Sequence, residues 1–268
     1  MPVIKSNGIN INYNEYGNKD GEVLLLIMGL GAPGGTWEKH LNEYRNHFRC
    51  IVPDNRGAGD SDKPAGDYNT IEMAADAMGV IDALGIDKFH VNGISMGGAI
   101  AQNIAIAYAS RVKSCIITAS WAYCDNYMKN VFEMLKTTRS NMSYANFSQM
   151  FLLWLYSAET YRNNPEIITE SLQNNIIDLF PMPQHAFNSQ VAACSRHDTR
   201  EKLKDITSPV LITAGDKDIF TPIECSKYLN ENIKNSRLEV FEKYTHTHHW
   251  EDLDRYNKVT VDFINEHK

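Results

Sequence analysis

The sequence predicts one α/β domain with a mostly parallel sheet and helices on both faces. Short apolar runs, typical of strands buried on both faces, alternate with segments of helical periodicity up to about residue 120 and again after residue 205. A length of 268 residues suits one large domain of this class. A helical stretch that interrupts the alternation predicts an insertion over the sheet.

The chain opens with a predicted hairpin, because residues 3–16 alternate polar and apolar side chains around the turn-forming pair Asn7-Gly8. We expect this hairpin to form an antiparallel edge of the sheet. Six more strands are expected, at residues 23–28, 49–52, 89–92, 114–119, 209–214 and 238–241. Helices are expected from about residue 36, over 70–84 with Gly85 as a stop, after Gly97, over 223–232 and over 250–266.

Residues 121–198 have a different character. They contain no strand-like run, and their helical patterns are interrupted near Pro165, Pro181 and Pro183. We therefore expect two kinds of unit. These are an α/β core made of residues 1–120 and 199–268, and a helical cap made of residues 121–198.

The predicted cap is rich in aromatic residues and methionine. Most of this enrichment is expected from helices that cover a sheet, and some of it from the lining of an apolar pocket. Trp121 directly follows a strand and is the expected pocket wall. Arg196 and Arg200 could bind a substrate carboxylate, although a solvated helix face is the simpler interpretation. We expect Asp54 and Arg56 to form a structural ion pair.

The net charge of −7 and the pI near 5.7 argue against nucleic acid or an anionic membrane surface as a partner. No run of about 18 apolar residues occurs, and the first residues lack the apolar segment of a signal peptide. The five cysteines are widely spaced and odd in number. We interpret them as free thiols, which predicts a cytoplasmic protein.

Residues 89–109 carry the clearest sign of chemistry. A strand-like run ends in Gly93-Ile94-Ser95-Met96-Gly97, and a helical pattern follows. In this G-x-S-x-G pattern a sharp turn lifts the serine hydroxyl out of the sheet, and small residues are needed two positions to either side. The helix N-terminus would then point at an oxyanion formed there. The alternative is a glycine-rich turn that only closes a strand.

A serine nucleophile needs a base and a carboxylate that orients the base. Asp216 and Asp218 follow one expected strand, and His246, His248 and His249 follow the last one. Both loops should open at the edge of the sheet that carries the serine. From the residues alone, either aspartate and any of the three histidines could take part. The histidines could also bind a metal, but one of them is already explained by the serine, and we expect no metal site.

Taken in order, these segments resemble the α/β-hydrolase family, and most closely its 3-oxoadipate enol-lactonase and carboxylesterase branch. The resemblance covers nearly the whole chain outside the insertion. It includes the loop 28–31, the run 53–64, the serine turn, the loop 215–222 and the final histidine segment. It implies that Ser95 is the nucleophile and that Asp218 is the acid of a G-x-x-D-x-x-x-P loop. His246 has the family's spacing to Glu251 and Tyr256, which implies that it is the base.

The oxyanion hole of such an enzyme consists of two backbone N–H groups. One belongs to the residue after the nucleophile, here Met96, and the resemblance places the other at Leu30. The family commonly has H-G-x-G in this loop, whereas Met28 stands in the place of the histidine. That histidine supports the loop and is not a donor, so we expect the hole to be retained. The rigidity of the loop and the exact donor are left open.

The resemblance implies a serine hydrolase that cleaves a small-molecule ester or lactone through an acyl-enzyme, without a cofactor. A homodimer is compatible with the sequence. Three alternatives remain open. The same three side chains could hydrolyse a C–C bond or carry out perhydrolysis, the fold could bind a ligand without turnover, or the protein could be a metal hydrolase.

Overall fold

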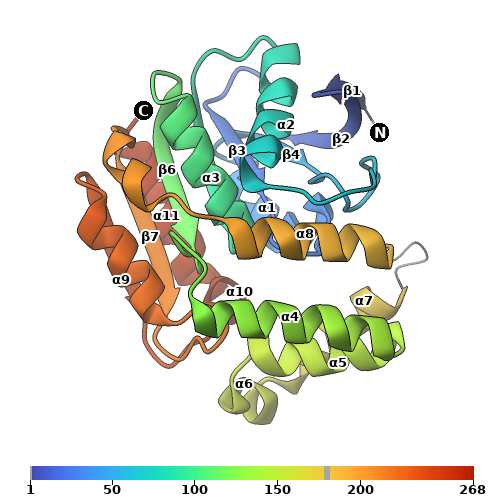
Figure 1. Ribbon diagram of the computed structural model, residues 1–268. Helices are drawn as coiled ribbons and strands as arrows, with labels where there is room; N and C mark the ends of the chain where they lie inside the picture. The colour runs from blue at the N-terminus through green and yellow to red at the C-terminus, as the bar shows by residue number, and fades with distance from the viewer. Residues whose placement is uncertain (1, 178–181) are drawn as a thin grey trace.

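The computed structural model describes residues 2–177 and 182–268. Within this part of the chain, eight strands form one sheet in the order β1-β2-β4-β3-β5-β6-β7-β8 (Figure 1). The strands are β1 (Val3–Ser6), β2 (Ile9–Tyr16), β3 (Val23–Ile27), β4 (Arg49–Pro53), β5 (Phe89–Ile94), β6 (Val112–Thr118), β7 (Val210–Gly215) and β8 (Ser236–Phe241). Neighbouring strands are parallel throughout the segment β4-β3-β5-β6-β7-β8 of this order. Strand β2 pairs antiparallel with both of its neighbours, β1 and β4. The predicted fold class is confirmed.

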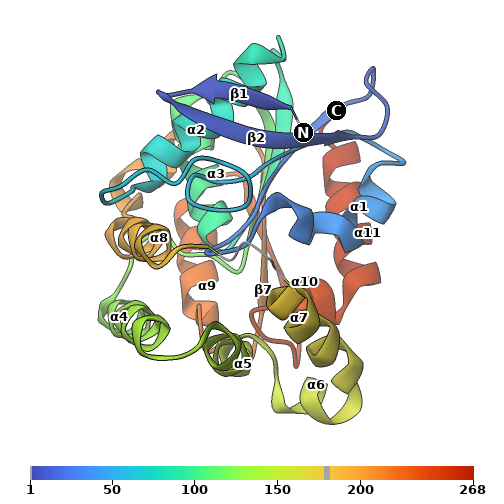
Figure 2. The same cartoon turned by 90° about the vertical axis from the view of Figure 1, so that its right-hand side faces the viewer.

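Helices cover both faces of this sheet (Figure 2). The core helices are α1 (Glu38–Tyr44), α2 (Thr70–Ala83), α3 (Met96–Ala107), α9 (Ile223–Asn232) and α11 (Leu253–Asn265). Helices α1 and α11 pack on one face, and α2, α3 and α9 pack on the other. This arrangement follows from the right-handed crossovers that connect parallel strands.

Strand β3 shows why the apolar runs are continuous. All five of its residues are buried, and successive side chains enter different cores. Leu24 and Leu26 belong to the cluster that contains Trp37, whereas Leu25 and Ile27 belong to the cluster on the opposite face. A strand covered on both faces needs apolar residues at every position, which is the pattern that the sequence displays.

Local signals account for several element boundaries. Asn7 and Gly8 both have positive φ, 50° and 84°, as a two-residue hairpin turn requires. Asn69 caps α2 by accepting a hydrogen bond from the N–H of Glu72 at 2.9 Å. Gly85 follows α2 with a φ of 66°, which ends the helix in the left-handed conformation.

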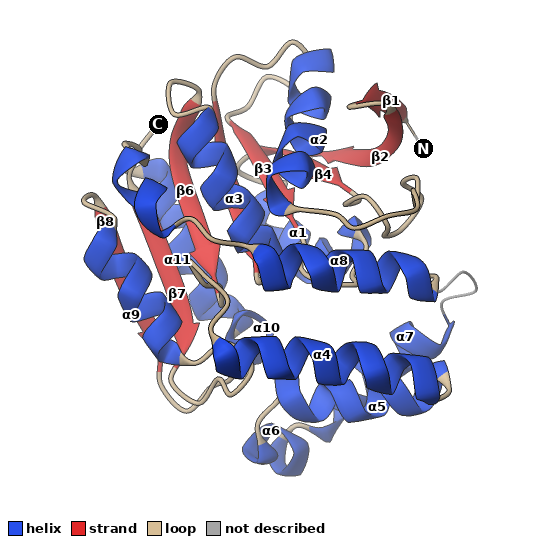
Figure 3. Cartoon of the chain, viewed as in Figure 1, coloured by secondary structure: helices blue, strands red, loops and turns tan. Residues whose placement is uncertain are grey.

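The stretch between β6 and β7 is helical, as predicted. It contains α4 (Asn126–Asn141), α5 (Tyr144–Leu155), α6 (Ala158–Asn163), α7 (Pro165–Ile177) and α8 (Gln184–Arg196). Figure 3 shows α4, α5 and α6 beyond the end to which β6 points, with α8 between them and the core helices. Pro165 is the first residue of α7 and Pro183 caps α8, so both prolines separate helices. Pro181 lies outside the described residues.

The last predicted helix is divided in two. A short helix, α10 (His248–Glu251), is separated from α11 by Asp252, whose φ of −130° and ψ of 63° are not helical. Glu251 turns back and accepts hydrogen bonds from the N–H and the hydroxyl of Thr245, at 3.0 and 2.8 Å. Among the described residues, no helix is both long enough and apolar enough to cross a bilayer.

Candidate active site

Four loops that follow parallel strands meet at one edge of the sheet. Leu30 follows β3, Ser95 follows β5, Asp218 follows β7 and His246 follows β8. Because the strands are parallel, their carboxyl ends lie at the same edge. The topology therefore brings together residues that are far apart in the chain.

Ser95 has the strained backbone expected of this turn, with a φ of 56° and a ψ of −117°. Its flanking glycines are needed for space. A Cβ atom on Gly93 would lie 2.1 Å from the carbonyl oxygen of Gly97, and one on Gly97 would lie 2.1 Å from that of Ile27. A Cβ atom on Gly98 would lie 2.6 Å from Cβ of Ser120. The sequence fits a serine turn because other residues would clash.

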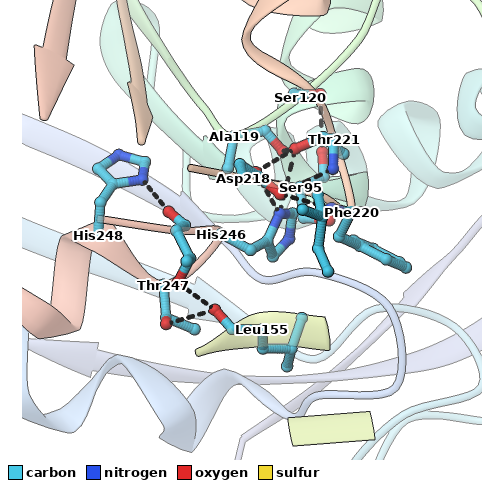
Figure 4. A network of polar contacts seen from close by, with 12 residues as sticks. Ser95, Ala119, Ser120, Leu155, Asp218, Phe220, Thr221, His246, Thr247 and His248 are labelled. Atoms are coloured by element: carbon cyan, nitrogen blue, oxygen red, sulfur yellow. Dashed lines mark hydrogen bonds and ion pairs between the residues drawn. The ribbon is translucent and has the colours of Figure 1, made fainter. Parts of the chain in front are cut away.

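Asp218 and His246 form a buried pair. His246 Nδ1 lies 2.8 Å from Asp218 Oδ2 (Figure 4). Asp218 Oδ1 accepts hydrogen bonds from the N–H groups of Phe220 and Thr221 at 2.8 and 2.9 Å. The Thr221 hydroxyl lies 2.6 Å from Asp218 Oδ2 and 3.1 Å from His246 Nδ1. Since Nδ1 faces the carboxylate, Nε2 is the nitrogen of His246 left for chemistry.

Hydrogen bonds to the helical insertion hold the loop of His246 in place. The hydroxyls of Thr245 and Thr247 donate hydrogen bonds to the carbonyl oxygen of Leu155, at 2.6 and 2.8 Å. Figure 4 shows the contact between Thr247 and Leu155 beside the imidazole. Leu155 is the last residue of α5, so the position of this histidine depends on the helices above it.

Ser95 and His246 line the same cavity, but the structure does not join them. Within the described part of the chain, the Ser95 hydroxyl makes no hydrogen bond to the imidazole. In ligand-free enzymes a hydrogen bond between nucleophile and base is often long and tightens when substrate binds. The structure thus pairs Asp218 with His246 and places Ser95 in the same cavity as that pair.

The two predicted oxyanion donors have free N–H groups. Leu30 and Met96 are both buried, and within residues 2–177 and 182–268 neither amide donates a hydrogen bond. Buried N–H groups without a partner are rare and destabilising by about 1–3 kcal/mol each. Gly29 lies next to the nucleophile, since a Cβ atom added there would be 3.2 Å from that of Ser95. Both amides are therefore available to a ligand at the serine.

A glutamine of the helical insertion supports the loop in which Met28 replaces the family's histidine. Gln190 of α8 is fully buried, and its Oε1 accepts a hydrogen bond from the N–H of Gly31 at 2.8 Å. Its Nε2 donates to the carbonyl oxygen of Arg56, also at 2.8 Å. On the other side, Asn55 Nδ2 donates to the carbonyl oxygen of Met28 at 2.8 Å. Sequence reasoning missed Gln190, which carries no local motif.

Gln190→Leu should lower kcat by about 10- to 100-fold with little change in KM, because a loosened loop misplaces one donor and loss of a donor costs about 10²–10³ in kcat. Steady-state kinetics on any turned-over ester would measure this. Gln102→Leu is the matched control, since Gln102 is also fully buried and bonds to Trp121 and Thr199. A Gln190→Leu variant with kcat within twofold of wild type would contradict this supporting role.

The cavity has a volume of about 720 Å³. Ser95 and His246 line it together with aromatic residues of the insertion and of the Asp218 loop, including Phe147, Phe187 and Phe220. Phe220 also meets the imidazole of His246 edge-on, with ring centroids 4.9 Å apart. A cavity of this size, with aromatic residues beside two reactive side chains, suits a small molecule.

Trp121 does not line the cavity, which corrects the sequence prediction. Its side chain is fully buried and packs against Phe132 and His197, with ring centroids 5.6 and 6.3 Å away. Periodicity identifies a buried aromatic residue but cannot tell which of two interiors it enters. The residue belongs to the core between the sheet and the insertion.

The charged residues that the sequence analysis considered are paired with other residues of the protein. Arg196 and Arg200 form exposed ion pairs with Asp67 and Asp198, each at 2.6 Å, and neither lines the cavity. The expected pair of Asp54 and Arg56 is wrong. Arg56 binds Asp76 through two hydrogen bonds, at 2.5 and 2.8 Å. Asp54 instead accepts hydrogen bonds from the N–H groups of Gly34 and Asp60, at 2.6 and 3.0 Å.

Two more histidines of the C-terminal segment are buried beside the site. His248 Nε2 lies 3.0 Å from the hydroxyl of Thr213, and His249 Nδ1 lies 3.1 Å from Nε2 of His40. Burial lowers the pKa of His248 to about 3 and that of His40 to about 4. Burial also lowers the pKa of His249 well below its usual value. These imidazoles are neutral parts of the interior.

Buried neutral histidines predict acid sensitivity. Burial lowers the pKa values of His40, His90 and His197 to about 4 and that of His248 to about 3, and it lowers the pKa of His249 well below its usual value. Between about pH 4 and 6.5 the unfolded chain binds more protons, so each histidine removes up to about 1.4 kcal/mol of stability per pH unit as pH falls. We expect acid unfolding with a midpoint at about pH 5.

Circular dichroism and Tm measurements from pH 7.5 to 4 would test this expectation. His90→Gln should reduce the dependence of Tm on pH, because one of the five titrating groups is removed. A Tm that stays constant down to pH 4.5 would contradict the prediction.

Comparisons with known proteins agree with the observed fold. The model of one protein family, described as alpha/beta hydrolase fold, matches residues 22–253. The 2-hydroxy-6-oxo-6-phenylhexa-2,4-dienoate hydrolase of Comamonas testosteroni is 31% identical over 270 residues, which cover 95% of this chain and 91% of that protein. A protein of Azorhizobium caulinodans assigned as carbamate hydrolase RutD is 27% identical over 266 residues, which cover 99% of both chains. The enol-lactonase from Burkholderia xenovorans LB400 has the same fold, with a TM-score of 0.90, 21% identity, and coverage of 98% of this chain and 100% of that one.

Proposed function

Since the chain belongs to the α/β-hydrolase family, we propose that it is a serine hydrolase that cleaves a small ester or lactone. The observation that carries this proposal is the buried pair of Asp218 and His246 beside a strained Ser95 in one cavity. A serine in this turn and a histidine oriented by a carboxylate are the parts that acyl transfer requires.

In the proposed reaction, Ser95 Oγ attacks the carbonyl carbon of the ester while His246 Nε2 takes the hydroxyl proton. The negative charge that forms on the carbonyl oxygen is stabilised by the N–H groups of Leu30 and Met96. The intermediate then collapses, the C–O bond to the alcohol breaks, and the leaving alkoxide takes the proton from His246. Water, deprotonated by the same histidine, attacks the acyl-enzyme and releases the carboxylic acid and free Ser95.

The surroundings support each role in this reaction. Asp218 keeps the proton of His246 on Nδ1, so that Nε2 can act as a base. The free amides of Leu30 and Met96 support the oxyanion hole. A cavity of about 720 Å³ supports a small substrate. All five cysteines are free thiols, which supports a cytoplasmic location.

A second candidate is C–C bond hydrolysis on the same side chains. It is favoured by the 31% identity to a 2-hydroxy-6-oxo-6-phenylhexa-2,4-dienoate hydrolase. Serine attack on a ketone carbon adjacent to the scissile bond would use the same base and oxyanion hole. The reaction type therefore depends on which substrate the cavity accepts.

Two experiments test the proposal. A fluorophosphonate should form one covalent adduct, which peptide mapping places on Ser95, whereas no labelling would indicate a ligand-binding protein without turnover. A panel of aryl esters, lactones, carbamates and ring-cleavage diketones should give the highest kcat/KM with an ester or lactone. A diketone as the best substrate would favour C–C hydrolysis. Activity lost on dialysis against a chelator would favour a metal hydrolase.

A further inference from the structure

One wall of the cavity is polar and is formed by elements of both the core and the insertion. This polar wall consists of Thr36, Lys39, Asn42, Glu170, Ser171 and His249. Helices α5 and α8 contribute mostly aromatic and aliphatic side chains instead. Lys39 and Glu170 form an ion pair at 2.6 Å and so neutralise each other. A substrate that fills the cavity would place an apolar part against α5 and a polar part against this wall.

The tautomer of His249 is defined by its partners. His40 Nδ1 lies 2.7 Å from Oδ1 of Asn257, an oxygen that can only accept, so Nδ1 carries the proton of that ring. His40 Nε2 then has a lone pair and must accept from His249 Nδ1, 3.1 Å away. The Nε2 atom of His249 is consequently left with a lone pair.

This lone pair has no partner within residues 2–177 and 182–268. Among the described residues, none forms a hydrogen bond with His249 Nε2, although the side chain is 99% buried and lines the cavity. The ring cannot easily turn away, since it packs against Trp250 and Tyr256 with centroids 4.4 and 5.7 Å apart. The atom is open to the cavity and is not among the fully buried unpaired atoms, so a hydroxyl group of a bound molecule can reach it and donate the missing hydrogen bond.

We propose that His249 Nε2 accepts a hydrogen bond from a neutral hydroxyl group of the substrate. The inference rests on the proposed function, because His249 shares its cavity with Ser95 and His246. It narrows the substrate class to hydroxylated esters or lactones. A carboxylate would fit less well, since it has no proton to donate at neutral pH and Glu38 and Glu170 line the same cavity.

Two pairs of isosteric substrates test the proposal. They are 2-hydroxyethyl butanoate against propyl butanoate, with the hydroxyl in the alcohol, and ethyl 3-hydroxybutanoate against ethyl 3-methylbutanoate, with the hydroxyl in the acyl group. In at least one pair the wild-type kcat/KM should favour the hydroxylated member by about tenfold or more. His249→Phe should reduce that ratio to about one, mainly by slowing the hydroxylated substrate.

The ratio of two rates on one preparation does not depend on the fraction of folded enzyme, so partial misfolding cannot imitate the result. His249→Gln, whose amide oxygen can reach the position of Nε2, should keep part of the preference. His248→Gln should leave the ratio unchanged, because His248 bonds to Thr213 and Thr245 and does not line the cavity.

The inference is overturned if neither pair shows a hydroxyl preference in the wild type, or if the ratio for His249→Phe stays within twofold of wild type. Either result, obtained with a protein that is labelled on Ser95 and cleaves propyl butanoate, leaves the ester-hydrolase proposal standing. If no ester is cleaved and Ser95 is not labelled, the proposed function fails first and this inference fails with it.

Discussion

Replacing Ser95 with alanine should lower kcat by about 10⁴- to 10⁶-fold and change KM little. Without the hydroxyl no acyl-enzyme can form, and only the oxyanion hole and substrate binding remain to assist attack by water. Folding should be unaffected, because alanine keeps the Cβ atom of Ser95 and so accepts the same backbone with its φ of 56°. Initial rates on the best ester of the panel, with protein purified away from host esterases, would measure the loss.

A second serine of the same cavity provides the control. Ser148 of α5 is buried and lines the cavity, but it forms no hydrogen bond with Asp218 or His246. Ser148→Ala should therefore keep kcat within about threefold of the wild-type value, because it removes one hydroxyl from the cavity wall while the nucleophile remains. If Ser95→Ala retains more than one tenth of the wild-type kcat, another group carries the reaction.

The position of Ser95 could be predicted because its determinants are local. A strand, a turn and a helix follow one another within twenty residues, and the glycines two places before and after the serine are required by contacts of 2.1 Å. The hairpin at Asn7-Gly8 could be predicted for the same reason, since positive φ at both residues is a property of the turn alone. Patterns of this kind depend on residues that are close in sequence.

Support from distant residues could not be predicted. Gln190 reaches Gly31 across 159 positions, and its role depends on how α8 lies on the core. The same holds for His249, whose tautomer depends on His40, 209 positions away. The position of Trp121 directly after a strand suits both the cavity and the core beneath it, and only packing decides between these two interiors. Sequence periodicity identifies a buried face but not the neighbour that covers it.

Asp218→Asn should lower kcat by about 10³- to 10⁴-fold while leaving the fold intact. The amide oxygen of asparagine should occupy the place of Oδ1, where the N–H groups of Phe220 and Thr221 point. Its NH₂ group then takes the place of Oδ2 and faces His246 Nδ1 at about 2.8 Å. Two donors cannot form a hydrogen bond, so the imidazole proton moves from Nδ1 to Nε2. An Nε2 atom that carries a proton cannot accept one from Ser95, and the base is lost.

Asp216→Asn separates this effect from a general effect of charge on the loop. Asp216 lies two residues earlier, is partly exposed, and binds the N–H of Lys243 at 2.5 Å and Lys217 at 3.2 Å. Its replacement should change kcat by less than about threefold, because it does not touch the imidazole. Comparing kcat and Tm of both variants would decide the matter. A large loss of kcat for Asp216→Asn with a small loss for Asp218→Asn would mean that Asp216 is the acid. The expected opposite order would mean that the tautomer of His246, rather than the charge of the loop, limits the reaction.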